Sequence, residues 1–228
     1  MILTQRKIND DFDSKPSINH EYNFEISKPY IKNKLILDVG CWSGQYAQLA
    51  VKLAKKVCGV DPNHEAINLG KKLVPQAEFK TGSVLNIPYS NNRFDVVVFS
   101  EVIEHIPQGA EKQALGEIKR VLKPKGILML STPNAHPISI LLDPAYFLIG
   151  HRHYGQKNME KLVSSSGYVI KKSYLTRGIM HLISYNIESL FKIFTRKKPV
   201  FSRWVYKFLD RELYGGGFAS LYIIAQKP

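Results

Sequence analysis

From residue 34 onward the chain alternates short apolar runs with amphipathic segments, and no other feature of the sequence constrains the fold as much. Apolar runs of strand length, separated by segments of helix length, predict βαβ units and a mostly parallel sheet. The expected strands are Lys34–Val39, Val57–Asp61, Glu78–Thr81, Phe94–Ser100, Gly126–Thr132, Tyr168–Leu175 and Phe218–Ala225. The expected helices are Gln45–Lys55, His64–Leu73, Glu111–Leu122 and a segment at 158–166.

Two segments indicate how the chain is organised into one domain. The run FDVVVF, residues 94–99, is apolar almost throughout, so we expect this strand in the middle of the sheet, covered on both faces. Ahead of the last expected strand, the pattern changes to two helix-like stretches at about 179–214. The second stretch repeats apolar residues at helical spacing: Phe201, Trp204, Val205, Phe208 and Leu209. We predict one domain over 34–228 with this helical insertion, preceded by an N-terminal segment, 1–33.

The two cysteines and the lack of long apolar segments indicate the cellular compartment of the protein. If their strands pair in parallel, Cys41 and Cys58 lie on the order of 10 Å apart along the strands, too far for a disulfide. Free thiols suit a reducing compartment. The first residues contain no apolar core of signal-peptide length, and no run of about 18 uncharged apolar residues could span a membrane. We expect a cytoplasmic protein, and peripheral contact with a membrane stays open.

The net charge of +13 is unevenly distributed along the chain. Residues 135–228 carry 14 basic and 5 acidic side chains, so most of the excess lies in the C-terminal part. Such a surface attracts the phosphates of lipids, nucleic acids or small anions. A contribution to solubility alone is the other interpretation.

The segment LILDVGCWSGQYAQLA runs from a strand through a glycine-bracketed turn into a helix. Sheets of this kind present backbone N–H groups to a nucleoside at such a turn. Gly40 and Gly44 allow an approach of the backbone that a Cβ would block. Asp38 would repel a pyrophosphate but suits the cationic methionine moiety of S-adenosylmethionine. The turn has neither the Gly-Lys-Ser/Thr of a P-loop nor the G-x-G-x-x-G of a dinucleotide site.

A second acidic residue, Asp61, ends the next expected strand in VCGVDPN. A carboxylate at this place can accept hydrogen bonds from both ribose hydroxyls of a nucleoside. Asp61 follows Gly44 by 17 residues, close to the interval of about 20 in dinucleotide folds. Either motif alone is common in α/β proteins, and together they predict a nucleoside site.

These motifs, with TGSVLNIPYSNNRFDVVVFSEVIEHI and VLKPKGILMLSTPN, resemble the class I S-adenosylmethionine-dependent methyltransferase family. The resemblance is to the type 11 branch, which includes ubiquinone-biosynthesis O-methyltransferases, and it covers residues 34–134. It implies a Rossmann-like, doubly wound α/β sheet of seven strands, mostly parallel with an antiparallel last strand. It also implies S-adenosylmethionine as cofactor, bound by Asp38, Gly40, Cys41, Trp42, Gly44, Asp61, Pro62, Ser83, Val84 and Ser100.

Two positions depart from the family pattern. Trp42 stands where the family usually has glycine, so the turn must accept a bulky side chain. Ser83 stands where the family usually has aspartate, which removes a charged acceptor for the adenine amine. Both departures affect the residue assignments more than the cofactor.

Methyl transfer from a sulfonium is an in-line displacement, so holding the acceptor close can supply much of the acceleration. A hydroxyl acceptor must also lose its proton, and His105 is our candidate general base. A structural or capping role is the other interpretation of His105. His151, Arg152 and His153 either form a solvated basic turn or face an anionic group of the acceptor.

A divalent metal is a further possibility at the expected end of the fourth strand. Glu101, Glu104 and His105 resemble a metal triad of some ubiquinone-pathway relatives. Three ligands within five residues need a special backbone to converge, so we assign no metal ligand. In the N-terminal segment, His20, Tyr22 and Phe24 resemble the family's cofactor lid, and core packing is the simpler interpretation.

The predicted function is O-methylation of a small-molecule or lipid-linked acceptor, which the basic excess suggests is anionic. RNA methylation and a non-catalytic scaffold that binds S-adenosylmethionine are the alternatives. The aromatic and basic residues of the insertion also suit peripheral contact with an anionic membrane. Binding of nucleic acid is less expected because no added RNA-binding module is visible. The acceptor atom and the oligomeric state stay open.

Overall fold

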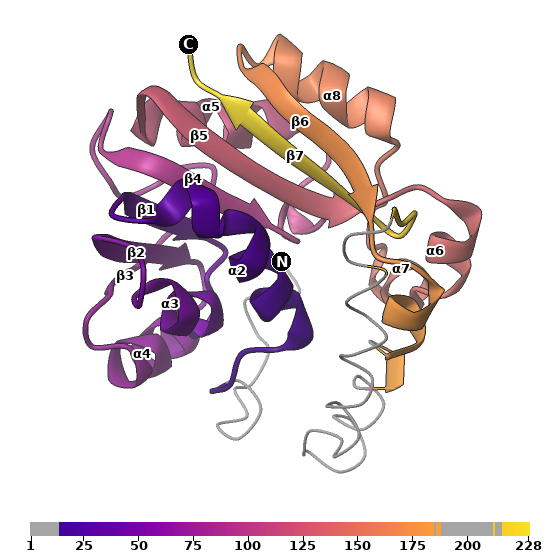
Figure 1. Cartoon of the computed structure of the whole chain (residues 1–228), viewed down its shortest axis with the longest axis horizontal. Helices are drawn as coiled ribbons and strands as arrows, with labels where there is room; N and C mark the ends of the chain where they lie inside the picture. The colour runs from indigo at the N-terminus through magenta and orange to yellow at the C-terminus, as the bar shows by residue number, and fades with distance from the viewer. Residues whose placement is uncertain (1–13, 185, 188–211, 213–215) are drawn as a thin grey trace.

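The computed structural model describes residues 14–184, 186, 187, 212 and 216–228. Seven strands form a single sheet in the order β3-β2-β1-β4-β5-β7-β6 (Figure 1). The strands are β1 (Leu35–Val39), β2 (Lys56–Asp61), β3 (Glu78–Thr81), β4 (Phe94–Ser100), β5 (Leu122–Pro133), β6 (Val169–Thr176) and β7 (Ser220–Gln226). β7 is antiparallel to both of its neighbours, and the pairs from β3 to β5 are parallel. The expected α/β sheet with an antiparallel last strand is confirmed.

Helices cover both faces of the sheet and enclose two apolar cores. One core contains side chains of α5 (Glu111–Val121) and α8 (Gln156–Ser165). The other contains side chains of α2 (Ile18–Ile31), α3 (Gln45–Ala50) and α4 (His64–Leu73). Strand β4 supplies Phe94, Val97 and Phe99 to the first core and Val96 and Val98 to the second. The FDVVVF strand therefore lies mid-sheet and is covered on both faces, as predicted.

Two elements differ in length from the prediction by more than one residue. The helix expected at Gln45–Lys55 ends at Ala50, because the chain then turns back toward the start of β1. There, Asn33 N–H donates to the carbonyl of Leu53 at 3.0 Å, and Lys55 N–H donates to that of Lys34 at 2.9 Å. Strand β5 begins four residues earlier than expected, since Leu122 pairs with Phe94 across a bulge.

The N-terminal helix α2 packs on the sheet and on α3. Tyr22 is 2% exposed, and its hydroxyl bonds with that of Thr176 at the end of β6. The hydroxyl of Tyr46 in α3 donates to Ser27 Oγ at 2.7 Å. Tyr22 is thus a buried packing residue, and Phe24, partly buried, packs against the core that contains α3 and α4 side chains.

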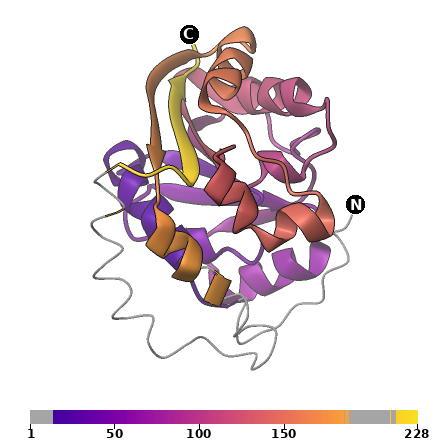
Figure 2. The same ribbon diagram turned by 90° about the vertical axis from the view of Figure 1, so that its right-hand side faces the viewer.

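Short helices lie beyond the carboxyl end of β5: α6 (Pro137–Leu141), α7 (Pro144–Ile149) and a helical segment at 179–184. Figure 2 shows these helices side by side at one end of the molecule. The Glu212 carboxylate accepts backbone hydrogen bonds from Gly178 and His181, which fixes the start of the segment at 179–184. Most of the insertion predicted at 179–214, including its apolar stripe, lies outside the described residues.

Cys41 and Cys58 are both buried free thiols, as expected from their spacing. Within the described part of the chain, every helix is too short or too polar to cross a membrane.

Candidate functional site

The turn between β1 and α3 is tied to the neighbouring strand β2. The N–H groups of Gly40 and Cys41 both donate to the carbonyl of Val60, at 2.8 and 3.2 Å. Gly40 and Gly44 have left-handed backbones, with φ of 77° and 78°. A Cβ at Gly40 would collide with Val102, and one at Gly44 would lie 2.6 Å from the ring of Phe79. Both glycines are therefore required by backbone conformation and by packing inside the protein, in addition to any approach of a ligand.

Asp61 at the end of β2 holds this turn in place. Its carboxylate accepts hydrogen bonds from the N–H of Trp42 at 3.0 Å and from the N–H of Asn63 at 2.8 Å. Trp42 has φ of 48° and is half-buried, so the turn accommodates the bulky side chain with a left-handed backbone. Pro62 lies between Asp61 and Asn63, and Asn63 caps α4. Burial raises the pKa of Asp61.

Asp38 is the more deeply buried of the two acids, at 6% exposure. Burial raises its pKa to about 7, and the nearby charge of Asp61 contributes. A buried carboxyl whose charged form is disfavoured gains from a cation placed against it. Asp38 therefore suits a positively charged ligand group such as a sulfonium or an ammonium.

The other predicted cofactor residues lie at the same edge, because the parallel strands β1 to β4 end there. Ser83 is exposed in the turn after β3, and its Oγ accepts the N–H of Leu85 at 3.1 Å. Val84 is 8% exposed and belongs to the core. Ser100 ends β4, and its buried Oγ has no hydrogen-bond partner among the described residues. Cofactor contact at these positions stays a prediction.

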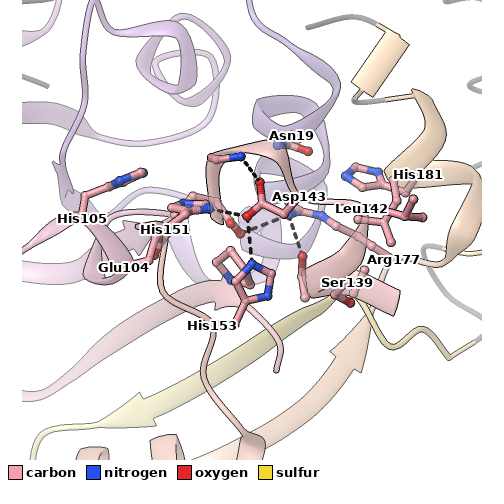
Figure 3. A pocket seen from close by; sticks show the side chains of 16 residues that line it. Asn19, Glu104, His105, Ser139, Leu142, Asp143, His151, His153, Arg177 and His181 are labelled. Atoms are coloured by element: carbon pink, nitrogen blue, oxygen red, sulfur yellow. Dashed lines mark hydrogen bonds and ion pairs between the residues drawn. The ribbon is translucent and has the colours of Figure 1, made fainter. Parts of the chain in front are cut away.

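A cavity of about 290 Å³ opens beside this edge. Its wall includes side chains from the turn after β4, from the segments around α6 and α7, and from the end of β6 (Figure 3). The titratable residues of the wall are Glu101, Glu104, His105, Asp143, His151, His153, Arg177 and His181. The sequence analysis indicated Glu101, Glu104 and His105 near the expected strand end and, separately, His151 and His153. The structure adds the other three.

His105, the candidate base, lies in the 3-10 turn η2 (Ile103–His105) on the cavity wall. Its ring stacks on that of His151 with 4.6 Å between the ring centres. Burial lowers the pKa of His105 to about 4, and the charge of His151 adds to the effect. The imidazole is therefore neutral at pH 7, with a lone pair available.

The carboxylate of Asp143 contacts two histidines, His151 and His153. Its Oδ2 lies 2.6 Å from His151 Nδ1 and 2.8 Å from His153 Nε2. Burial opposes a charge on His151, but the contacts with Asp143 and Glu104 outweigh it and raise the pKa of His151 to about 10. Burial likewise raises the pKa of Glu104 to about 7. Glu104 Oε1 and His151 Nε2 face each other at 3.7 Å, which is an ion-pair distance and too long for a hydrogen bond.

Arg152 fits neither interpretation given above for residues 151–153, the solvated basic turn or the contact with an anionic acceptor group. Its guanidinium donates to the carbonyls of Ile103 at 2.8 Å and Glu104 at 3.3 Å, and it pairs with Glu111. Arg152 therefore holds η2 in position, and only its two histidine neighbours contact the cavity described above.

Asp143, Arg177 and His181 were absent from the sequence prediction. Arg177 is 2% exposed and donates to Glu101 Oε1 and to Ser220 Oγ, both at 3.0 Å. This pairing directs Glu101 away from a group with Glu104 and His105, so the EVIEH residues do not converge as a triad. Asp143 precedes a proline and caps α7 by accepting a hydrogen bond from the N–H of Ala145. An aspartate before a proline is common at the start of a helix, so the sequence did not mark Asp143 as a site residue. Arg177 carried no sequence signal.

Comparisons with known proteins agree with the motifs. Residues 37–130 match the family described as "Methyltransferase domain". A Mycolicibacterium smegmatis protein named "Probable S-adenosylmethionine-dependent methyltransferase" is 28% identical over 146 residues, 64% of this chain and 55% of that protein. A ubiquinone biosynthesis O-methyltransferase of Alkalilimnicola ehrlichii is 29% identical over 116 residues, 49% of this chain and 46% of that protein. The chain spans about half the length of the curated relatives it matches.

Among solved structures, the cyclase SpnF superposes with a TM-score of 0.66 at 19% identity, over 92% of this chain and 80% of that one. At this identity the likeness shows the fold alone. The family match and the relatives' names indicate S-adenosylmethionine as the cofactor, and a buried acid at the end of β1 fits its cationic group. With the motifs in order along a sheet of the expected topology, residues 37–130 match the methyltransferase domain family, and the chain is similar to class I S-adenosylmethionine-dependent methyltransferases.

Proposed function

We propose that the protein methylates a hydroxyl group of a small-molecule or lipid-linked acceptor. The observation that carries the proposal is the position of the cavity, whose wall begins at Glu101, the residue after the predicted cofactor residue Ser100 at the end of β4. An in-line displacement needs the acceptor oxygen held next to the methyl donor, and an adjoining cavity meets this requirement. S-adenosylmethionine supplies the methyl group when bound.

Each side chain has a distinct part in this proposal. Asp38 stabilises the cationic end of the cofactor and Asp61 accepts the ribose hydroxyls. His105 takes the proton of the acceptor hydroxyl, because it lies on the cavity wall with a neutral ring. The cationic His151 beside it favours an acceptor with a polar or anionic group.

Methyl transfer from labelled S-adenosylmethionine to a panel of acceptors tests the proposal. The panel contains phenols, sugars, hydroxylated lipids, amines and structured RNA, and the product atom is identified by mass spectrometry. We expect label on a hydroxyl oxygen, and no label with Asp38→Asn. Transfer to RNA or to nitrogen alone would replace the proposed reaction, and cofactor binding without transfer to any class would favour a non-catalytic scaffold.

A further inference from the structure

We propose that Asp143, His151 and His153 form a binding site for a divalent transition-metal ion of the Zn²⁺ class. The site uses neither Glu101 nor His105, but it shares His151 and the cavity wall with the proposed function, and a bound metal ion would supply the positive charge there in place of a protonated His151. In Figure 3 the carboxylate of Asp143 lies between the two imidazole rings, on the wall of the cavity. The three ligand atoms lie within 4.8 Å of one another.

The order of residues in the chain explains why the three side chains meet. His151 and His153 are two positions apart after α7, so both point to the cavity while Arg152 between them points to η2. Asp143 lies at the other end of α7 and faces the same space. All three side chains are largely buried, with exposures of 13% for His151, 3% for His153 and 11% for Asp143.

The hydrogen bonding of His153 favours a cation in this space. Its Nδ1 lies 3.1 Å from the carbonyl oxygen of Asn134, and a carbonyl oxygen only accepts, so Nδ1 carries the proton. In its neutral form, the form that binds metal ions, the ring directs the lone pair of Nε2 at the Asp143 carboxylate, 2.8 Å away. Two acceptors facing each other at this distance repel, and a metal ion bound by both removes the conflict. A backbone carbonyl on the far nitrogen is also the usual support of a metal-binding histidine.

His151 has the corresponding support from a carboxylate. With Nδ1 toward Asp143, its Nε2 faces Glu104 Oε1 at 3.7 Å. The side chain of Glu104 is fully buried, and this oxygen has no hydrogen-bond partner among the described residues. A metal on Nδ1 would place the ring proton on Nε2, where Glu104 can accept it. Both histidines thus have an acceptor behind the nitrogen that does not bind metal.

The donor set and the spacing select the kind of metal. Two imidazoles and one carboxylate suit Zn²⁺ and its first-row neighbours, whereas Mg²⁺ prefers oxygen ligands throughout. Ligands on a tetrahedral Zn²⁺ at about 2.0–2.1 Å lie roughly 3.3 Å from one another. The two contacts with Asp143, at 2.6 and 2.8 Å, need to open by well under 1 Å, and three protein ligands leave a fourth position.

The test is titration of the tag-free full chain with Zn²⁺ alone, in competition with a chromophoric chelator, followed by Co²⁺ absorption spectra. Neither cofactor nor acceptor is present, so failure of the methyl-transfer assay and failure of metal binding are distinguishable. We expect one Zn²⁺ per chain, a visible Co²⁺ band typical of mixed nitrogen and oxygen ligands, and at least 100-fold tighter binding of Zn²⁺ than of Mg²⁺.

The Zn²⁺ affinities of variants distinguish residues that bind or support the metal ion from residues outside the site. His153→Gln and Asp143→Asn should each weaken Zn²⁺ binding by at least 100-fold, and Glu104→Gln by roughly 10- to 100-fold through loss of the ring support. His64→Gln and His136→Gln, outside the cluster, should leave it unchanged. Each variant's circular dichroism and S-adenosylmethionine binding confirm that it folds. Equal Zn²⁺ affinity in the wild type and in His151→Gln/His153→Gln, or preference for Mg²⁺, would overturn the assignment and leave the cluster as a hydrogen-bonded support.

Discussion

At the scale of single residues, we expect the buried carboxyl of Asp38, as the proposed partner of the cofactor's cationic group, to make cofactor affinity depend on pH. Burial raises its pKa to about 7, and a bound cation favours the charged form, so binding must release a proton at lower pH. We expect the affinity for S-adenosylmethionine to rise roughly 5- to 10-fold between pH 6 and 7.5. Calorimetry at several pH values measures this, and Asp38→Asn should bind more weakly with no such pH dependence.

Without the cofactor, the buried carboxyl of Asp38 makes the folded protein less stable as pH rises. Because the folded-state pKa of Asp38 lies above the ordinary value of 3.8, the folded protein holds a proton that the unfolded chain releases, and stability is lost as pH rises toward and through about 7. Asp38→Asn should therefore raise the melting temperature more at pH 8 than at pH 5. A uniform shift at both pH values would mean that this carboxyl does not titrate as described.

The proposed role of His105 as general base is tested by replacing this residue. If it accepts the acceptor's proton, His105→Ala should lower kcat by ~10²–10⁴ while cofactor affinity changes little. His136→Ala serves as the control, since His136 lies outside the cavity wall. An unchanged kcat would leave proximity as the source of acceleration and return His105 to a structural role beside His151.

At the scale of elements, the β1–α3 turn and helix α5 respond oppositely to the same substitution. Gly44→Ala introduces a Cβ at φ of 78° and 2.6 Å from Phe79, so we expect a loss of about 2–4 kcal/mol from strain and crowding. Gly116 lies exposed within α5 with nothing within 4 Å of an added Cβ, and Gly116→Ala should stabilise by about 0.8 kcal/mol. Urea denaturation measures both, and a neutral Gly44→Ala would contradict the described packing.

Local pattern accounts for the elements that the sequence predicted well. The continuous apolar run of β4 reports burial on both faces, and β3 matches its predicted bounds residue for residue. The start of β5, Leu-Lys-Pro-Lys, has the composition of a polar turn, so the sequence does not indicate a strand there. Its pairing with β4 depends on a bulge, which the local pattern does not reveal. The pairing of Glu101 with Arg177 joins residues 76 positions apart, and the Asp143 cluster depends on how α7 returns the chain to the cavity. Contacts of this kind have no periodicity and no motif, so they emerge only from the fold.

At the scale of the whole molecule, one segment of the sequence is strongly basic and two described helices expose large apolar side chains. Lys192, Arg196, Lys197, Lys198, Arg203, Lys207 and Arg211 belong to the insertion, against the single acid Asp210 in that span, and lie outside the described residues. Among the described residues, α6 and α7 expose Leu141, Phe147 and Leu148 by 71%, 64% and 80%. Basic and large apolar side chains together are typical of a surface that contacts an anionic membrane.

We therefore expect the protein to bind anionic vesicles at low salt, with about 1 kcal/mol from each basic residue near the lipid surface. Changing Lys197, Lys198, Arg203 and Lys207 to Gln should lower co-sedimentation with anionic vesicles strongly, whereas neutral vesicles and high ionic strength should abolish it in the wild type. The control variant changes Lys52, Lys55, Lys71 and Lys72 to Gln, which removes the same charge from exposed positions around α3 and α4. Equal losses in both variants would mean that net charge alone attracts the protein. If wild type ignores anionic vesicles at low salt, the insertion is better explained as a cover for an acceptor or as a contact between chains.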